Sequence, residues 1–277
     1  MPLLSTEESV SIYYEHHEPS KRAGPTVIFS CAYCTTHENW RGQVEPLLEA
    51  GFPVVLWDLR GHGDSVVPDA DSAFSIEQVV ADLLAVADAT SPEAPVVAAG
   101  LSFGGLASLH FMMAHPDRVA ALALIASGPG FKNPEAAAGW AAQVERTAQF
   151  LEKRGFDDFV AGKAGATCIG SKPELPPAQA AAAAIRKQSV AGVARFGRRV
   201  SGPAPSAIDA LGGMDVPALV LVGENDRAFS RAGEVMAAKM PQARHVVIPD
   251  AGHIVNIEQQ AEFNAALLAF LREVAGS

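Results

Sequence analysis

The chain has 277 residues, and 49% of them are hydrophobic, which is ample for a sizeable core in one large domain or two small ones. Its formal net charge is −10 at pH 7. Nucleic acids and anionic membranes are polyanions that such a surface repels on average, so the charge disfavours both as partners.

The beginning of the chain and its cysteines bear on the compartment. The stretch MPLLSTEESVSIYYEHHE has no basic region followed by an apolar region, so we expect no secretory signal. No uninterrupted apolar run is long enough to span a bilayer. Three cysteines do not form a disulfide framework, which fits a reducing environment, and we expect a cytoplasmic protein.

Apolar runs typical of buried strands alternate with segments of helical spacing. The runs are 25–31, 52–58, 94–100, 119–127, 216–224 and 244–250, and the clearest helical segments are 76–89 and 106–116. Near-continuous apolar strands separated by helices require a parallel sheet covered on both faces, so the sequence predicts an α/β fold. Residues 9–18 alternate more loosely and predict an antiparallel edge strand, in which the adjacent His16 and His17 point to opposite faces.

Residues 131–214 interrupt this alternation, because they contain alanine-rich helical stretches and no convincing strand. In the first stretch Asn133 is the expected N-cap and Gly155 the expected terminator. We therefore expect a helical cap at 131–214 over one edge of the sheet, and a core made of residues 1–130 and 215–277.

The segment AAGLSFGGLAS, residues 98–108, places Ser102 between an expected strand and an expected helix. A serine on so sharp a turn needs a glycine two residues before it and another two residues after it, and Gly100 and Gly104 meet this requirement. The turn directs the hydroxyl out of the sheet, while the positive N-terminal end of the helix faces negative charge that forms beside it. Taken alone, the segment is equally consistent with a glycine-rich turn and a passive serine.

Two further residues follow later strands and fit the needs of a nucleophilic serine. Asp226 comes just after the run 216–224, and His253 just after 244–250. A serine hydroxyl needs an imidazole that takes its proton and a carboxylate that orients the imidazole. The carboxyl ends of parallel strands share one edge of a sheet, so the three residues are predicted to meet there, although an aspartate after a strand is more often a turn former.

Four segments together resemble the α/β-hydrolase superfamily, in its single-domain form with a helical cap, and the resemblance covers essentially the whole chain. They are the GLSFGG turn, the GENDRAF loop with Asp226, the DAGHIVNIEQ loop with His253, and the stretch VVLWDLRGHGDS. The resemblance implies a catalytic triad of Ser102, Asp226 and His253. It also implies structural roles for Asp58 and His62 in the loop after their strand.

The resemblance extends to the loop that begins at Cys31. Relatives usually carry a His-Gly dipeptide after the strand that aligns with VIFS, and the backbone N–H of the next residue forms half of the oxyanion hole. Aligning Trp40 with a tryptophan common downstream places Cys31-Ala32 at this dipeptide. The resemblance therefore assigns the two donors to the backbone N–H groups of Tyr33 and Phe103. Alanine in place of glycine restricts the dihedral angles of the loop.

The same loop contains the sequence CAYC, which leaves other interpretations open. A thioredoxin-like dithiol would place the second cysteine in a helix, whereas helical signals begin only near Glu38. Zinc bound by Cys31, Cys34 and His37 lacks an evident fourth ligand. The remaining interpretation is that these cysteines line a pocket without taking part in catalysis.

Together these features predict a serine hydrolase that cleaves a small to medium, mostly apolar carboxylic ester or lactone through an acyl-enzyme, with no cofactor and no metal. The same triad also serves C–C bond hydrolases and cofactor-free perhydrolases, and a slow-turnover ligand-binding or signalling protein would keep the same shell. The partner that we expect is a small-molecule substrate, and the oligomeric state is left open.

Side chains of the expected cap bear on the choice among these functions. Five aromatic residues would either form an apolar pocket or pack the cap: Phe131, Trp140, Phe150, Phe159 and Phe196. Five arginines would either bind a substrate carboxylate, which C–C hydrolases acting on dienoic acids need, or face solvent: Arg146, Arg186, Arg195, Arg198 and Arg199.

Overall fold

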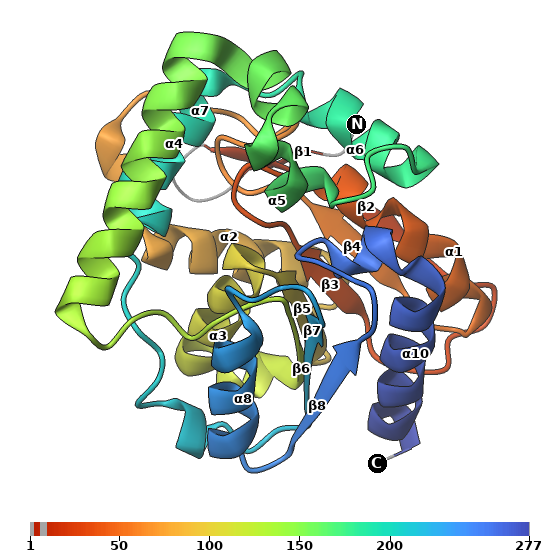
Figure 1. Cartoon of the computed structure of the whole chain (residues 1–277). Coiled ribbons are helices and arrows are strands. Elements are labelled where there is room, and N and C mark those ends of the chain that lie inside the picture. The colour runs from red at the N-terminus through yellow and green to blue at the C-terminus, as the bar shows by residue number, and fades with distance from the viewer. Residues whose placement is uncertain (1–2, 6–9, 277) are drawn as a thin grey trace.

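The computed structural model describes residues 3–5 and 10–276. The predicted core also includes positions outside the described residues, namely 1–2, 6–9 and 277, and the predicted N-terminal strand begins at one of them, Ser9. In the described part of the chain, eight strands form one sheet in the order β1-β2-β4-β3-β5-β6-β7-β8 (Figure 1). The strands are β1 (Leu3–Ser5), β2 (Ser11–His17), β3 (Val27–Ser30), β4 (Val54–Trp57), β5 (Val96–Leu101), β6 (Val119–Ile125), β7 (Ala218–Gly223) and β8 (Ala243–Ile248).

The strand directions give the mostly parallel sheet that the sequence predicts. From β4 through β3, β5, β6 and β7 to β8, neighbouring strands are parallel, and β2 pairs antiparallel with β4. The predicted antiparallel strand is therefore present, but its predicted place at the edge is wrong, because β1 pairs with it on its outer side. With only three residues, β1 is too short to show an alternation of apolar and polar side chains.

Helices cover both faces of the sheet. Outside 131–214 these are η1 (His37–Trp40), α1 (Arg41–Glu49), η2 (Asp71–Ala73), α2 (Ile76–Thr90), α3 (Phe103–Ala114), η3 (Pro116–Arg118), α8 (Ser230–Lys239), α9 (Val255–Glu258) and α10 (Gln260–Gly276). In β4, Val54 and Leu56 pack into the core on the face of α1 and α10. Val55 and Trp57 pack into the core on the face of α2, α3 and α8. Successive side chains along a strand thus point into two different cores, one on each face of the sheet. For this reason the central strands are apolar throughout.

Residues 131–214 lie between β6 and β7 and contain helices and connecting turns. The helices are α4 (Pro134–Ala161), η4 (Lys163–Gly165), α5 (Ala166–Ile169), α6 (Pro176–Ile185), α7 (Val190–Phe196), the π-helical turn η5 (Gly197–Ser201) and η6 (Leu211–Gly213). In Figure 1, α4, α5, α6 and α7 lie together at the end of the sheet toward which the arrowhead of β8 points. Asn133 caps α4 as predicted, because its side chain accepts the backbone N–H groups of Glu135 and Ala136.

Gly155 ends the first helical stretch of α4, as the sequence predicts, but a second helical stretch follows it directly. The φ of 73° and ψ of −179° of Gly155 are not helical and suit a glycine. The helix kinks there and continues to Ala161. The residues after the kink include the buried Phe156, Phe159 and Val160, and their burial favours a resumed helix over a loop.

A buried ion pair ties the loop after β4 to α2. Arg60 is 1% exposed and Asp82 is 0% exposed, and the guanidinium donates to both carboxylate oxygens over 2.8 Å each. We expect Asp82→Ala to lower the free energy of unfolding by about 3–5 kcal/mol, because the guanidinium loses the carboxylate that compensates its charge. Urea denaturation measures this loss.

The matched control for this prediction is Asp88→Ala, on the same helix. Asp88 is the exposed partner of Arg118, at 2.8 Å. Exposed ion pairs contribute below about 1 kcal/mol, so this variant should unfold almost as the wild type does. Equal losses of stability in the two variants would contradict the predicted role of the buried pair.

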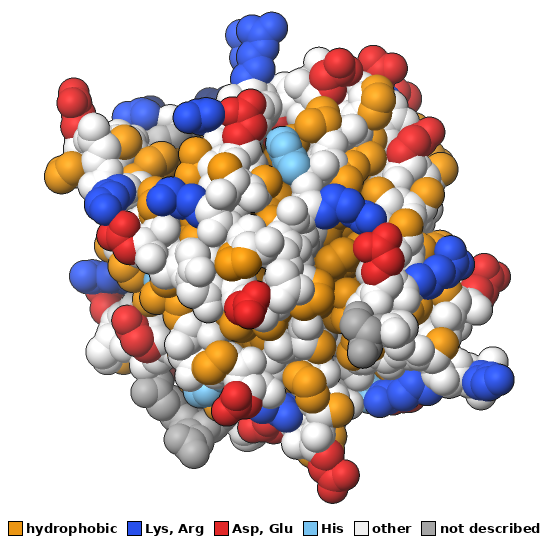
Figure 2. Space-filling model, turned by 90° about the horizontal axis from the view of Figure 1, so that it is seen from below, with side chains coloured by type: hydrophobic (Ala, Val, Ile, Leu, Met, Phe, Trp, Pro, Cys, Tyr) orange, Lys and Arg blue, Asp and Glu red, His pale blue; other side chains and the backbone are white. Residues whose placement is uncertain are grey.

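Charged side chains are mixed on the face of the molecule seen in Figure 2. Lys and Arg side chains lie there among Asp and Glu side chains, with apolar side chains scattered between them. In the part of the chain that the structure describes, no helix is both long and apolar enough to cross a membrane.

Candidate active site

Ser102 occupies a strained turn between β5 and α3. Its φ of 53° and ψ of −114° lie outside the regions that residues other than glycine usually adopt. A Cβ atom on Gly100 would lie 2.2 Å from the backbone of Gly104, and one on Gly104 would lie 2.3 Å from the backbone oxygen of Ser30. The backbone passes so close on both sides of the serine that both positions require glycine, which is the reason for the spacing noted in the sequence.

Asp226 and His253 lie in the loops after β7 and β8 and bind each other. Nδ1 of His253 donates to Oδ2 of Asp226 over 2.7 Å, and Asp226 is buried. A Cβ atom on Gly223 would lie 2.3 Å from the backbone oxygen of Gly252, so the two loops touch through their backbones. The hydrogen bond holds a proton on Nδ1 and leaves Nε2 able to accept another.

The structure brings the three predicted triad residues to one cavity. Ser102, Asp226 and His253 border a cavity of about 310 Å³ that is also walled by α4 and α5. Among the described residues, the His253 ring forms a hydrogen bond with Asp226 but none with the hydroxyl of Ser102. Catalytic hydrogen bonds are often long until substrate binds. Phe229, which sequence reasoning did not single out, stacks on the imidazole with ring centroids 4.9 Å apart.

Two backbone N–H groups near Ser102 are candidates for an oxyanion hole. Phe103 is the first residue of α3, so its N–H is one of the N-terminal groups that have no partner within the helix. Tyr33 follows β3 in a turn closed by a hydrogen bond from the N–H of Thr35 to the carbonyl of Ala32 over 3.1 Å. Within the described residues neither N–H donates a recorded hydrogen bond, and both residues border a cavity with Ser102. Alanine at the expected glycine position is therefore compatible with an N–H of Tyr33 that donates to no other described residue.

His62 supports the loop that carries Tyr33. It is fully buried, and this burial lowers its pKa to about 4, so the imidazole is neutral at neutral pH. Its Nε2 accepts the backbone N–H of Cys34 over 3.3 Å. Because Cys34 has a φ of 68°, the hydrogen bond stabilises an uncommon backbone conformation directly after Tyr33. No sequence pattern marks this contact, since His62 and Cys34 are 28 positions apart.

The two cysteines of CAYC contact different partners. The thiol of Cys31 donates to the backbone oxygen of Trp57 over 3.2 Å. The thiol of Cys34 interacts with that of Cys168 in α5, which raises the pKa of Cys34 and lowers that of Cys168. Burial raises the pKa values of Cys31 and Cys34, so both thiols stay protonated and weakly nucleophilic. Both cysteines are free and buried, and Cys34 lines the larger cavity at Ser102.

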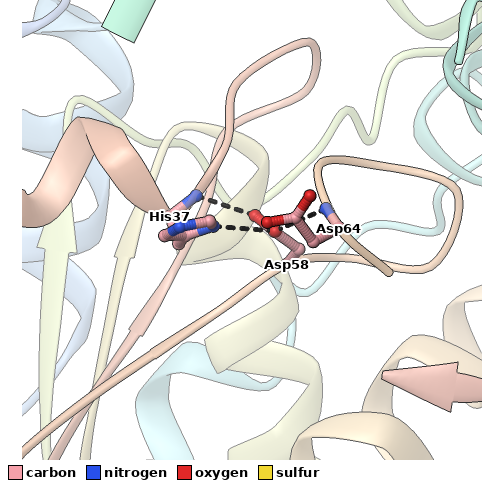
Figure 3. Close-up of side chains that lie close together, drawn as sticks. All are labelled: His37, Asp58 and Asp64. Atoms are coloured by element: carbon pink, nitrogen blue, oxygen red, sulfur yellow. Dashed lines mark hydrogen bonds and ion pairs between the residues drawn. The ribbon is translucent and has the colours of Figure 1, made fainter. Parts of the chain in front are cut away.

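His37 lies with two carboxylates, as Figure 3 shows, and not with the cysteines. Its Nδ1 lies 2.8 Å from Oδ2 of Asp58, and its backbone N–H donates to Oδ1 over 2.7 Å. The backbone N–H of Asp64 also donates to Asp58, over 2.9 Å. Burial acts to lower the pKa of His37, but hydrogen bonds to Asp58 and Glu38 outweigh it and raise this pKa to about 10. Asp58 therefore joins the loops after β3 and β4, and the zinc ligands considered above are not brought together in the described residues.

Ser102 also borders a second cavity, of about 200 Å³, which is mostly apolar. Three of the five aromatic residues expected in the cap line one or both cavities: Phe131, Trp140 and Phe159. The other two, Phe150 and Phe196, line neither. The two cavities adjoin beside the serine, because both are lined by Ser102, Tyr33, Trp140, Ala228 and Phe229.

The arginines expected in the cap bind other side chains at the surface. Their partners are Glu145 and Glu152 for Arg198, Asp71 for Arg195 and Arg199, Asp157 for Arg186 and Gln143 for Arg146. Among the described residues, none of these five arginines lines either cavity at Ser102. They are therefore not placed to meet a carboxylate of a substrate bound there.

Comparison with known proteins identifies the class that this fold and site define. The model of the α/β hydrolase fold family matches residues 25–260. The chain belongs to the α/β hydrolase fold family, and it is a hydrolase.

Similar proteins match the chain over nearly its full length. A protein of Bacillus subtilis (strain 168), provisionally named as a 2-succinyl-6-hydroxy-2,4-cyclohexadiene-1-carboxylate synthase, is 24% identical over 99% of this chain and 100% of its own. A thermophilic esterase from Thermogutta terrifontis is 27% identical with a TM-score of 0.83, covering 99% of this chain and 98% of the esterase. The enol-lactonase from Burkholderia xenovorans LB400 is 25% identical with a TM-score of 0.82, covering 98% of this chain and 99% of the enol-lactonase. These matches confirm the predicted superfamily and fold class.

Proposed function

We propose that this chain is a serine hydrolase that cleaves uncharged, small to medium carboxylic esters or lactones through an acyl-enzyme. One observation carries the proposal: Ser102 borders two cavities whose described walls contain no Asp, Glu, Lys, Arg or His side chain other than Asp226 and His253. A group that enters either cavity meets aromatic rings, aliphatic side chains and neutral polar groups such as Gln143 and Thr147. Such walls favour an uncharged substrate, because a charge buried there would lack a partner.

In the first half-reaction, Nε2 of His253 accepts the hydroxyl proton of Ser102 as the oxygen attacks the carbonyl carbon. Asp226 holds the imidazole through Nδ1 and stabilises the positive charge that forms on the ring. The backbone N–H groups of Tyr33 and Phe103 donate to the negative oxygen of the tetrahedral intermediate. The intermediate then expels the alcohol, which takes the proton from the imidazole, and an acyl-enzyme remains.

Water completes the reaction with the same groups. His253 accepts a proton from water as the water oxygen attacks the acyl carbon, and the same two N–H groups hold the second negative oxygen. The proton then returns to the oxygen of Ser102, the acyl bond breaks, and the carboxylic acid leaves. Each step uses groups of the chain and water.

The names of similar proteins support an ester or lactone substrate. The Thermogutta protein is named an esterase and the Burkholderia protein an enol-lactonase. The Bacillus protein is named for a carboxylate, which a cationic group binds better than neutral walls do. Hydrolysis of C–C bonds in dienoic acids needs such a cation as well, so the neutral cavities favour the ester and lactone reactions.

The test uses two p-nitrophenyl esters with acyl chains of equal length, the pentanoate and the monoglutarate, which differ in one terminal carboxylate. We expect kcat/KM to be about 100-fold higher for the pentanoate, because burying an unpaired carboxylate costs several kcal/mol and about 1.4 kcal/mol is a factor of ten. Release of p-nitrophenolate measures both rates. A preference for the glutarate would contradict an uncharged substrate, and no turnover of either ester would favour a ligand-binding protein.

A further inference from the structure

One buried carboxylate holds the loop of His253 from both sides. Glu258, the last residue of α9, is 4% exposed. Its Oε2 accepts the backbone N–H of Gly252 over 3.0 Å, and its Oε1 accepts that of Ile254 over 3.3 Å. These are the residues directly before and after His253, so the carboxylate restrains the backbone that carries the imidazole.

The same carboxylate binds the helical segment between β6 and β7. The hydroxyl of Ser171 donates to Oε2 of Glu258, and Nζ of Lys172 donates to the backbone oxygen of Glu258 over 3.3 Å. Ser171 and Lys172 follow α5, whose Thr167 and Cys168 line the larger cavity. Glu258 therefore connects one wall of the cavity to the loop of the catalytic histidine.

Two glycines make room for this carboxylate. A Cβ atom on Gly252 would lie 2.9 Å from Oε1 of Glu258. A Cβ atom on Gly170, which has a φ of +89°, would lie 2.8 Å from its Cγ. Backbone from two distant parts of the chain thus approaches Glu258 closely, which is how both parts reach its oxygens.

Glu258 has this influence without bordering the substrate. Among the described residues that line the two cavities at Ser102, Glu258 does not occur. A residue that does not touch substrate makes no direct contribution to its binding, while a displaced base slows the chemical steps. Loss of the carboxylate is therefore expected to lower kcat and to leave KM nearly unchanged.

We propose that Glu258 is a positioning residue for His253, and that its bond to Ser171 couples the alignment of this base to the docking of residues 170–172. The proposal rests on the proposed function, because it assumes that His253 is the base of the reaction. Removing the bond to Ser171 loosens the carboxylate, and the loosened carboxylate restrains the N–H groups on either side of His253 less well.

The principal test is Glu258→Gln, measured with p-nitrophenyl pentanoate. Glutamine keeps the volume but turns one acceptor oxygen into an NH₂ group, which cannot accept an N–H. We expect kcat to fall by about 10- to 100-fold with KM within about threefold of the wild type, because a displacement near 1 Å can cost a hundredfold in rate. Glu262→Gln is the matched control, since Glu262 is exposed and four positions further along the chain, and it is expected to retain wild-type kinetics.

Ser171→Ala and the double variant test the coupling. We expect Ser171→Ala to lower kcat by about three- to tenfold, and the double variant to be no slower than Glu258→Gln alone, because residues that act through one another are not additive. A merely structural role would give losses that follow thermal stability and multiply in the double variant. Should Glu258→Gln fail to fold, Ser171→Ala decides the matter alone.

The proposal is overturned if Glu258→Gln retains kcat within twofold, if its loss lies in KM, or if the two losses multiply. An unchanged kcat in Ser171→Ala also overturns it. Activity that survives Ser102→Ala would instead refute the proposed function. The two failures are therefore distinguishable in the same assay.

Discussion

Replacing Ser102 with alanine is expected to lower kcat by about 10⁴-fold or more, because the imidazole then has no hydroxyl to activate. Residual hydrolysis would come from binding and from the N–H groups at the oxyanion position. Alanine keeps the Cβ atom of serine, so the strained turn with its φ of 53° experiences no new steric conflict. The loss of activity should therefore occur in a folded protein, as circular dichroism and thermal unfolding would verify.

Two measurements test this prediction. Initial rates with p-nitrophenyl pentanoate give kcat, and covalent labelling by a fluorophosphonate, followed by peptide mass spectrometry, locates the nucleophile. We expect one label on the wild type, at Ser102, and none on the variant. Ser72→Ala is the control, since Ser72 is exposed and borders neither cavity. Retention of more than about 1% of the activity, or a label elsewhere, would show that another residue is the nucleophile.

Replacing Asp226 with asparagine is expected to lower kcat by about 10³- to 10⁴-fold, a magnitude taken from the same exchange in the serine-protease triad. The amide NH₂ of asparagine donates to Nδ1 of His253, where the carboxylate now accepts a proton over 2.7 Å. The imidazole then carries its proton on Nε2 and cannot accept one from Ser102. The geometry is retained while the chemistry is lost.

The control for this second prediction is Asp215→Asn. Asp215 precedes the same strand, β7, and its exposed carboxylate accepts from Gln242 over 2.7 Å. This variant should keep its kcat, because the residue lies outside both cavities. A loss below about tenfold in Asp226→Asn would indicate that another group orients the imidazole.

The central sheet could be predicted because its strands are buried on both faces. The segments VIFS, VVLW and ALVLVG are nearly continuous apolar runs, and the structure has β3, β4 and β7 there. The strand β1 could not be predicted, since three residues are too few to show an alternation of apolar and polar side chains. Gly155 shows another limit: a glycine predicts a break in a helix, but burial of the residues beyond it decides whether the helix resumes.

The positions of the three predicted triad residues at one edge of the sheet could be inferred from the sequence, whereas the contacts that support their loops could not. Each member of the predicted triad follows a strand, and parallel topology brings the carboxyl ends of those strands to one edge. By contrast, the bond from His62 to Cys34 and the bond from Ser171 to Glu258 depend on how loops and helices dock. Such contacts leave no fixed spacing in the chain. The surface partners of the arginines escaped prediction for the same reason.

The meeting of two cavities at Ser102 has a consequence for protein engineering. Leu106 and Ala232 border only the smaller cavity, whereas Gln143 and Thr147 border only the larger one. Under the proposed function, a substitution in one pair changes the room for one half of an ester and leaves the other walls intact. We therefore expect that acyl and alcohol selectivity can be evolved in separate rounds, with a small library at one pair of positions in each round.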